Sequence, residues 1–316
     1  MVVPVHSVSL TRRLFLEKSV KGTTALAFSG IFVFAPHQGK GADQSPQFID
    51  LPSPQFSAWT PAGKLLVTYI EKDGSYGLLR QGREAEESLI SVGTAAGQFN
   101  WPQGIAISGS IAYIVDSNNG RVQRLDLGSH RFLEPFGGLG KKTGLFLRPR
   151  GVSVFEDELL IADTRNHRIQ VFSLGGEVKR SFGELGDADG QFRLPTACAV
   201  SSQGEVFVVD SKHALVKVFG LDGRFIRKFG GLSSSRKERG LLNLPTGICL
   251  DGKRNAIYVA DTGNNRIQAF DAAGKFLGFI KPPGLELKAP QGLALLESRE
   301  MAVTDPEADR VWVIQL

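Results

Sequence analysis

Five aspartates recur at one position of a repeated segment, and they form the clearest set of residues that could do chemistry together. They are Asp116, Asp163, Asp210, Asp261 and Asp305. Four of them are followed five residues later by an arginine, namely Arg121, Arg168, Arg266 and Arg310. Carboxylates that converge from several segments can bind a metal ion or a substrate. An aspartate can also cap a turn and pair with an arginine, and we favour this structural role because the two residue types recur together.

Histidines are the other candidates for a metal site, and few are available. After residue 42 the sequence contains only His130, His167 and His213. A catalytic metal needs several ligands aimed at one point, whereas these histidines stand at turns of different repeats. We therefore predict neither catalytic residues nor metal ligands. A calcium or zinc ion in a central channel stays open as an alternative, because Asp and Asn side chains can bind calcium.

The chain has only two cysteines, Cys198 and Cys249, and this number limits its redox and metal chemistry. They exclude a disulfide-rich scaffold and a four-cysteine zinc or iron–sulfur site. The two residues stand in matching strands of neighbouring repeats, one position apart, so the alternation of a strand points them to opposite faces. We expect two buried free thiols.

An internal repeat of 44 to 51 residues supplies the elements that must position all of these side chains. The segments YIVDSNNGRVQRLD, LIADTRNHRIQVFS, FVVDSKHALVKVFG, YVADTGNNRIQAFD and AVTDPEADRVWVIQ align without gaps. Each unit has three or four short β-rich runs separated by Gly, Asp and Ser, which is typical of a small antiparallel sheet. In one unit these runs are 152–155, 159–162, 168–172 and 177–182, and we call them strands a, b, c and d.

A proline opens strand a of each unit, at Pro102, Pro149, Pro195, Pro245 and Pro290. Large apolar residues follow at alternate positions, such as Ile105 and Ile107, with a small residue such as Ala106 between them. A period of two places the large residues on one face and the small ones on the other. Neighbouring sheets can then pack large against small residues.

The first and last units depart from this pattern. In the first unit, residues 52–96, Pro54 keeps its place but Thr68 stands where the aspartate is expected. The last unit stops at Leu316, directly after its third strand. An unpaired strand edge is a liability, and the apolar segment 47–51 precedes the first unit. We therefore predict that this segment supplies the missing fourth strand of the last unit and closes the ring.

The pattern D-[ST]-x-N-x-R-[IV]-Q, preceded by P-x-G-[IV], resembles the NHL repeat over residues 97–316. This resemblance implies an all-β fold: a six-bladed β-propeller of four-stranded antiparallel blades, occupying residues 43–316 as a single domain. It does not decide the function, because such folds host unrelated activities. The family includes propellers that bind protein and RNA, and more distant six-bladed relatives include metal-dependent lyases and lactonases.

The two faces of such a disc differ in charge. Alternating strand direction places the b–c turns and d–a connections on one face, which we call the basic face. It carries Lys141, Lys142, Arg148, Arg150, Arg165, Arg193, Lys212, Arg236, Lys237 and Arg239. Few acidic residues other than Glu184, Asp187, Asp189 and Glu238 oppose them. Such a face can steer an acidic partner.

The residue after each repeat proline starts strand a near the axis, at the mouth of a central channel on the basic face. These residues are Gln103, Arg150, Thr196, Thr246 and Gln291. With Arg165 and Lys212 they form the binding site that we predict, a polar rim in which Arg150 is the single cation directly after a proline. A forked hydrogen bond from Arg150 would hold an anionic group, with pairing to an acid such as Asp163 as the alternative.

The first 42 residues resemble a twin-arginine export signal. Arg12-Arg13 precedes Phe15-Leu16, and an apolar run from 23 to 34 follows. This run is short for a bilayer span, so we predict a periplasmic or otherwise exported protein with no stable membrane span after signal removal. The net charge of +5 falls to +1 without this segment, which argues against a nucleic acid partner.

Two functions remain open at this point. We favour a non-enzymatic scaffold that docks an extracytoplasmic protein or peptide, acidic ones included, or an envelope polymer on the basic face. The alternative is an enzyme of the lyase or lactonase kind with a divalent metal in the channel.

Overall fold

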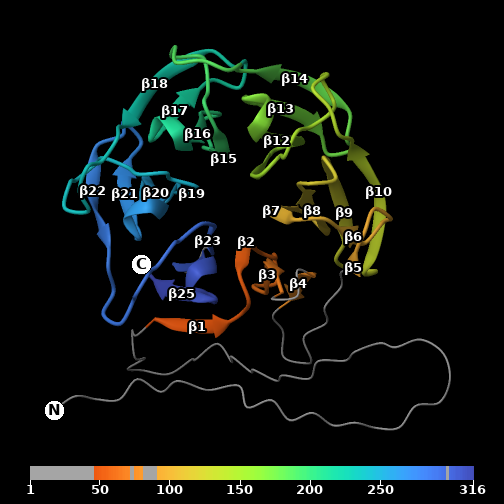
Figure 1. The fold of residues 1–316 in the computed structure, drawn as a ribbon, viewed down its shortest axis with the longest axis horizontal. Coiled ribbons are helices and arrows are strands. Elements are labelled where there is room, and N and C mark those ends of the chain that lie inside the picture. Colours follow the sequence, from red (N-terminus) through yellow and green to blue (C-terminus); the bar gives the residue numbers. More distant parts are fainter. Residues whose placement is uncertain (1–45, 72–74, 81–90, 297–298) are drawn as a thin grey trace, which may run out of the picture.

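The computed structural model describes residues 46–71, 75–80, 91–296 and 299–316. Within them the chain forms six small antiparallel sheets arranged as blades around a central axis (Figure 1). The prediction of a six-bladed β-propeller is therefore confirmed. The segment predicted as an export signal lies outside the described residues.

The blades follow one another along the chain, and each begins near the axis. Blade 1 contains β2 (Pro54–Trp59), β3 (Leu65–Ile70) and β4 (Tyr76–Arg80). Blade 2 contains β7 (Pro102–Ser108), β8 (Ile111–Asp116), β9 (Arg121–Asp126) and β10 (Arg131–Gly137). Blade 3 contains β11 (Val152–Phe155), β12 (Glu158–Asp163), β13 (Arg168–Ser173) and β14 (Val178–Phe182). A fourth strand of blade 1 would fall in residues 81–90, which lie outside the described residues.

The second half of the ring repeats this order. Blade 4 contains β15 (Pro195–Val200), β16 (Val206–Asp210), β17 (Leu215–Phe219) and β18 (Phe225–Gly230). Blade 5 contains β19 (Ile248–Asp251), β20 (Ala256–Asp261), β21 (Arg266–Asp271) and β22 (Phe276–Ile280). Blade 6 contains β23 (Leu293–Leu295), β24 (Glu300–Asp305) and β25 (Arg310–Gln315).

Short elements complete the fold. Four 3-10 turns directly follow repeat aspartates: η1 (Thr164–Asn166), η2 (Ser211–His213), η3 (Thr262–Asn264) and η4 (Pro306–Ala308). Strands β5 (Ser91–Val92) and β6 (Gln98–Phe99) form a small parallel pair. Corresponding parallel bridges tie Leu139 to Phe146, Leu185 to Phe192 and Leu232 to Leu242. The connections that lead from blades 1, 2, 3 and 4 to the next blade thus share this parallel pairing.

The N-terminal strand β1 (Gln47–Asp50) closes the ring as predicted. It lies beside β25 as the outer strand of blade 6 (Figure 1). The two strands pair antiparallel, and Phe48 stands opposite Trp312. The rings of Phe48 and Trp312 lie 5.4 Å apart, and the Leu51 N–H donates to the carbonyl of Asp309 at 3.0 Å. The last blade is therefore built from both ends of the described chain.

One position of blade 1 was assigned wrongly from the sequence. Pro54 pairs with Tyr69, as Pro102 pairs with Asp116 and Pro195 with Asp210. Tyr69, and not Thr68, therefore occupies the place of the repeat aspartate. The turn between strands a and b has five residues between Trp59 and Leu65 in blade 1, but two between Ser108 and Ile111 in blade 2. The spacing from proline to aspartate therefore differs between blades, and a count along the sequence misses by one.

Six apolar clusters fill the six interfaces between blades. For example, Ile105 packs toward blade 1 and the next residue, Ala106, packs toward blade 3. Cys198 likewise faces blade 3 and Cys249 faces blade 6, so the two thiols are buried, free and directed to different interfaces. Burial raises the pKa of Cys198 to about 12. The predicted alternation of large and small residues therefore builds the core.

The glycine of the P-x-G pattern marks the place where neighbouring blades touch near the axis. A Cβ atom on Gly247 would lie 1.9 Å from the carbonyl oxygen of Gln291. One on Gly151 would lie 2.7 Å from the Cα of Ala197. Only glycine allows this close approach of neighbouring blades near the axis.

Candidate functional site

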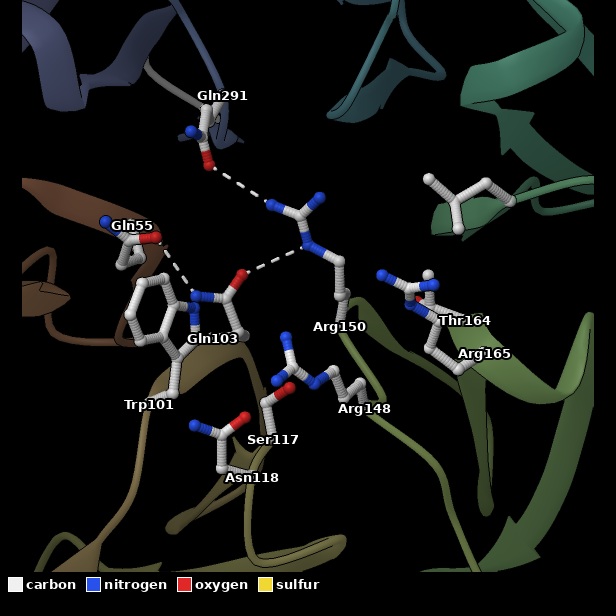
Figure 2. Close-up of a pocket in the computed structure, with 11 residues that line it drawn as sticks. Gln55, Trp101, Gln103, Ser117, Asn118, Arg148, Arg150, Thr164, Arg165 and Gln291 are labelled. Atoms are coloured by element: carbon white, nitrogen blue, oxygen red, sulfur yellow. Dashed lines mark hydrogen bonds between the residues drawn. The ribbon is translucent and has the colours of Figure 1, made fainter. Parts of the chain in front are cut away.

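Four of the six residues that follow the first proline of a blade meet at the channel mouth (Figure 2). Gln103 Nε2 donates to Gln55 Oε1 at 3.0 Å, and Arg150 Nε donates to Gln103 Oε1 at 3.2 Å. Arg150 Nη2 donates across the mouth to Gln291 Oε1 at 3.3 Å. The predicted rim residues of blades 2, 3 and 6 therefore form one hydrogen-bonded chain.

Gln55 belongs to this chain and is absent from the predicted site. It follows Pro54 in blade 1 just as Gln103 follows Pro102 in blade 2. Extending the proline spacing to the first blade would have found it.

Thr196 and Thr246 do not join the chain, although the same rule places them on the rim. The hydroxyl of Thr196 donates to the carbonyl of Thr246 at 3.0 Å, which ties blade 4 to blade 5. The hydroxyl of Thr246 lies 2.7 Å from that of Thr262. Both threonines are buried, so their role is to join blades.

Arg150 carries a partly buried charge without a carboxylate partner among the described residues. Its guanidinium bonds to the amide oxygens of Gln103 and Gln291, which are neutral. Asp163, the alternative partner predicted for Arg150, pairs with Arg168 instead and accepts a hydrogen bond from its Nε at 2.9 Å. Burial lowers the pKa of Arg150 to about 10, so the side chain remains charged at neutral pH.

The mouth holds a cavity of about 280 Å³ around these groups. Besides the amides and Arg150, its lining includes two further arginines, Arg148 and Arg165, and the indole of Trp101. The remaining lining residues are Ser117, Asn118, Thr164 and Leu194. The lining thus has three cations and no acidic residue. Such a site suits an anionic group, with amide donors and acceptors to orient it.

Trp101 and Arg148 have an unusual backbone conformation in common. Both directly precede a repeat proline and have left-handed backbones, with φ of 61° and 49°. Ser53 and Leu244 share this feature at the same place in blades 1 and 5. The conformation therefore belongs to the repeat, and at blades 2 and 3 it accompanies a side chain that lines the mouth.

The repeat aspartates hold the turns around the mouth in place. In blade 3, Asp163 accepts from the Leu147 N–H at 2.8 Å and from Asn166, Arg168 and Gln170. Arg168 in turn donates to the carbonyls of Lys142 and Leu145 at 2.9 Å. This network joins the b–c turn to the connection from blade 2. Asp116 and Asp261 have matching partners in Arg121 and Arg266.

Arg310 of blade 6 differs from the other repeat arginines. Its Nε bonds to Asp50 of the closing strand at 3.1 Å, and its guanidinium lies 4.1 Å from the ring centre of Phe48. Asp305 accepts instead from the backbone N–H groups of Lys288 and Ala289. The arginine therefore contributes to ring closure.

Blade 4 builds the same network from different residues. His213, Leu215 and Lys217 replace the Asn, Arg and Gln of blade 3. His213 Nδ1 lies 2.5 Å from Asp210, and Lys217 Nζ lies 3.4 Å from Asp210 and donates to the carbonyls of Ala188 and Gln191. Burial lowers the pKa of Lys217, opposed by Asp210. One ammonium thus replaces the guanidinium and the amide of the other blades.

Arg165 and Lys212 stand on b–c turns of the basic face, as predicted from the strand order, and both are exposed. Arg165 lines the mouth, and Lys212 lines a neighbouring hollow together with His167 and His213. His167 Nδ1 lies 2.7 Å from the carbonyl of Arg193. Across the described residues, no three His, Cys, Asp or Glu side chains gather in a way that could hold a metal. No helix in the described part of the chain could span a membrane.

Comparisons with known proteins agree with this architecture. Residues 146–172 and 242–270 match the NHL repeat. No curated protein matches the sequence significantly. Among solved structures, a streptogramin B lyase shares the fold with a TM-score of 0.59 at 12% identity, over 85% of this chain and 95% of that one.

Two further structures show the same fold. A structural genomics protein of unknown function from Bacteroides thetaiotaomicron has a TM-score of 0.65 at 13% identity, over 86% of this chain and 73% of that one. A chain of a nidogen–laminin complex has a TM-score of 0.58 at 16% identity, over 83% of this chain and 89% of that one. At these identities the likeness concerns the fold alone. The chain is therefore a six-bladed β-propeller in which one segment of the third blade and one of the fifth match the NHL repeat.

Proposed function

We propose that the protein is a non-enzymatic binding scaffold that captures an acidic protein segment at the channel mouth of its basic face. The observation that carries this proposal is Arg150, a desolvated guanidinium held between neutral amides in a cavity lined by three arginines and no acid. A bound carboxylate would give this charge the partner that it lacks, through a forked pair of hydrogen bonds.

The electrostatics of the surrounding face support the same conclusion. Arg148 and Arg165 take part in no ion pair within the described residues. Asp187, one of the acids of this face, is engaged by Arg193 at 2.6 Å and by His213 at 2.9 Å. An approaching acidic segment therefore meets unpaired cations at the mouth, which favours fast association at low ionic strength.

Binding of defined acidic probes to the purified propeller tests this function. We expect an Asp- and Glu-rich peptide to bind by isothermal titration calorimetry, and the Arg150→Gln variant to bind it at least tenfold more weakly, since a charge-assisted pair contributes a few kcal/mol. Arg239→Gln is the matched control, because Arg239 is exposed on the same face but does not line the mouth. Equal affinity of Arg150→Gln and wild type would remove Arg150 from the site.

We propose that this scaffold acts outside the cytoplasm, because residues 1–42 resemble a twin-arginine signal. Replacing Arg12 and Arg13 by lysine should retain the protein in the cytoplasm without changing its fold. Fractionation of cells that express each form tests this, and equal amounts in the envelope fraction would contradict it.

An enzyme of the lyase or lactonase kind remains the second candidate. The shared fold with a streptogramin B lyase motivates it, but no group of side chains that could hold a metal is gathered in the described residues. Metal analysis of the purified protein distinguishes the two candidates, because a stoichiometric divalent ion would favour the enzyme.

A further inference from the structure

A second hollow on the basic face continues the channel mouth outward between blades 3 and 4. Its volume is about 560 Å³, and it is lined by Arg165, His167, Leu185, Arg193, Leu194, Lys212 and His213. Arg165 and Leu194 line both this hollow and the mouth. The two hollows are therefore parts of one groove that runs from the axis toward the edge of the disc.

Leucine side chains give the outer part of this groove an apolar character. Leu185 follows the last strand of blade 3 and is 58% exposed. Leu139 and Leu232 occupy the same place after blades 2 and 4 and are 60% and 75% exposed. The backbone at each site is fixed by a parallel bridge to the next segment, such as Leu185 to Phe192. The exposure of Leu185 is thus imposed by the fold, and Leu185 is the one of the three that lines either of these two hollows.

Cations flank Leu185 and Leu194 along the groove. Arg165 stands where the two hollows meet, and Lys212 stands in the outer one. Neither takes part in an ion pair within the described residues. Arg193 is neutralised by Asp187, with two contacts of 2.6 and 2.8 Å. The groove therefore presents positive charge from end to end, with an apolar surface at its outer part.

We propose that this groove binds one extended acidic peptide segment, with a carboxylate at Arg150 and an aliphatic or aromatic side chain against Leu185 and Leu194. This inference rests on the proposed function and adds the chemical class of the ligand. The argument is complementarity: a peptide supplies both carboxylates and apolar side chains at neighbouring positions. An acidic polysaccharide supplies the charge alone and would leave Leu185 exposed.

Three probes of similar net charge test this inference against the wild-type propeller. They are an Asp- and Glu-rich decapeptide with two central leucines, the same peptide with serines in their place, and an oligogalacturonate. Fluorescence anisotropy measures each affinity. We expect the leucine peptide to bind about tenfold more tightly than the serine peptide, because it buries apolar surface against Leu185.

Two variants separate the outer groove from the mouth. Leu185→Ser should remove the preference for the leucine peptide, whereas Leu232→Ser, at the same place of the next blade and outside both hollows, should keep it. Equal affinities for both peptides would overturn the groove and leave the mouth intact. Tighter binding of oligogalacturonate would overturn the peptide as ligand. Failure of all three probes to bind would overturn the proposed function and this inference together.

Discussion

At the scale of single residues, the free-energy cost of burying the charge of Arg150 predicts how its replacement changes the stability of the protein. Its equivalents in blades 1, 2 and 6 are glutamines, which keep hydrogen bonding without a charge. We predict that Arg150→Gln leaves the melting temperature unchanged or raises it, because the variant removes a desolvated charge with a lowered pKa. Thermal denaturation followed by circular dichroism measures this.

Arg168→Gln provides the contrasting variant. It leaves the fully buried Asp163 without its ion pair, which should lower the stability by about 3 kcal/mol. If Arg150→Gln were destabilised to the same extent as Arg168→Gln, Arg150 would be a structural residue and the anion site would lose its main support.

The proline spacing of the sequence predicted the rim at this scale, but not every side chain direction. Gln103, Arg150 and Gln291 are long enough to reach across the mouth and bond to one another. Thr196 and Thr246 are short, so their hydroxyls bond to the nearest groups of adjacent segments instead. Which partner a side chain reaches depends on the distance between blades, and this distance is not encoded in the spacing within one blade.

At the scale of elements, the altered network of blade 4 predicts the effect of restoring the repeat. The triple variant His213→Asn, Leu215→Arg and Lys217→Gln would recreate the partners that Asp163 has in blade 3. We expect its melting temperature to equal or exceed that of the wild type, because a desolvated ammonium is replaced by an arginine pair and an amide.

The single variant Lys217→Met serves as the control for blade 4. It removes the donor to Asp210, Ala188 and Gln191 without a substitute, so it should destabilise the protein by about 2 kcal/mol. If the triple variant were less stable than Lys217→Met, blade 4 would require its own residues.

The closing strand β1 is the second element with a direct test. Truncation to Ser53 removes Phe48, Ile49 and Leu51 from the clusters of blade 6 and should cost roughly 5 kcal/mol, since each apolar side chain contributes about 1.5–3 kcal/mol when fully buried. Removal of residues 1–42 should have no effect. Thermal melts of both forms decide this, and equal melting temperatures would refute closure by this strand.

Elements were predicted better than their exact register. The periodicity of the sequence predicted the repeat aspartates of five blades. The incomplete last unit predicted that an extra outer strand is needed. The register of blade 1 could not be predicted in this way, because the length of the turn between strands a and b varies from blade to blade, and a count from the proline cannot allow for it. Tyr69 in place of aspartate also removes the side chain that marks the turn in the other blades.

At the scale of the whole molecule, outer-strand arginines join neighbouring blades. Arg180 of β14 bonds to Glu158 of its own blade at 2.7 and 2.5 Å and to the carbonyl of Leu221 in blade 4 at 2.8 Å. Arg227 of β18 repeats this with Glu205 and the carbonyl of Ala272 in blade 5. Each arginine therefore holds a carboxylate of one blade and a turn of the next.

These bridges predict how the stability of the ring depends on pH. The hydrogen bonds from Arg180 and Arg227 lower the pKa of Glu158 and Glu205 below the usual value of 4.5. A carboxyl group whose pKa is lower in the folded state stabilises the folded state fully above the unfolded pKa, and this contribution is lost as the pH falls through the folded pKa.

The double variant Arg180→Gln, Arg227→Gln should thus be less stable than the wild type at pH 7, by about 1 kcal/mol per pair. The difference should shrink below pH 4, while the raised pKa values of Asp116, Asp163 and Asp305 affect both proteins alike and cancel. Urea denaturation at pH 7 and pH 3 measures it, with the exposed Arg224→Gln as control; a difference that stays constant between the two pH values would show that the arginines act by packing and not by charge.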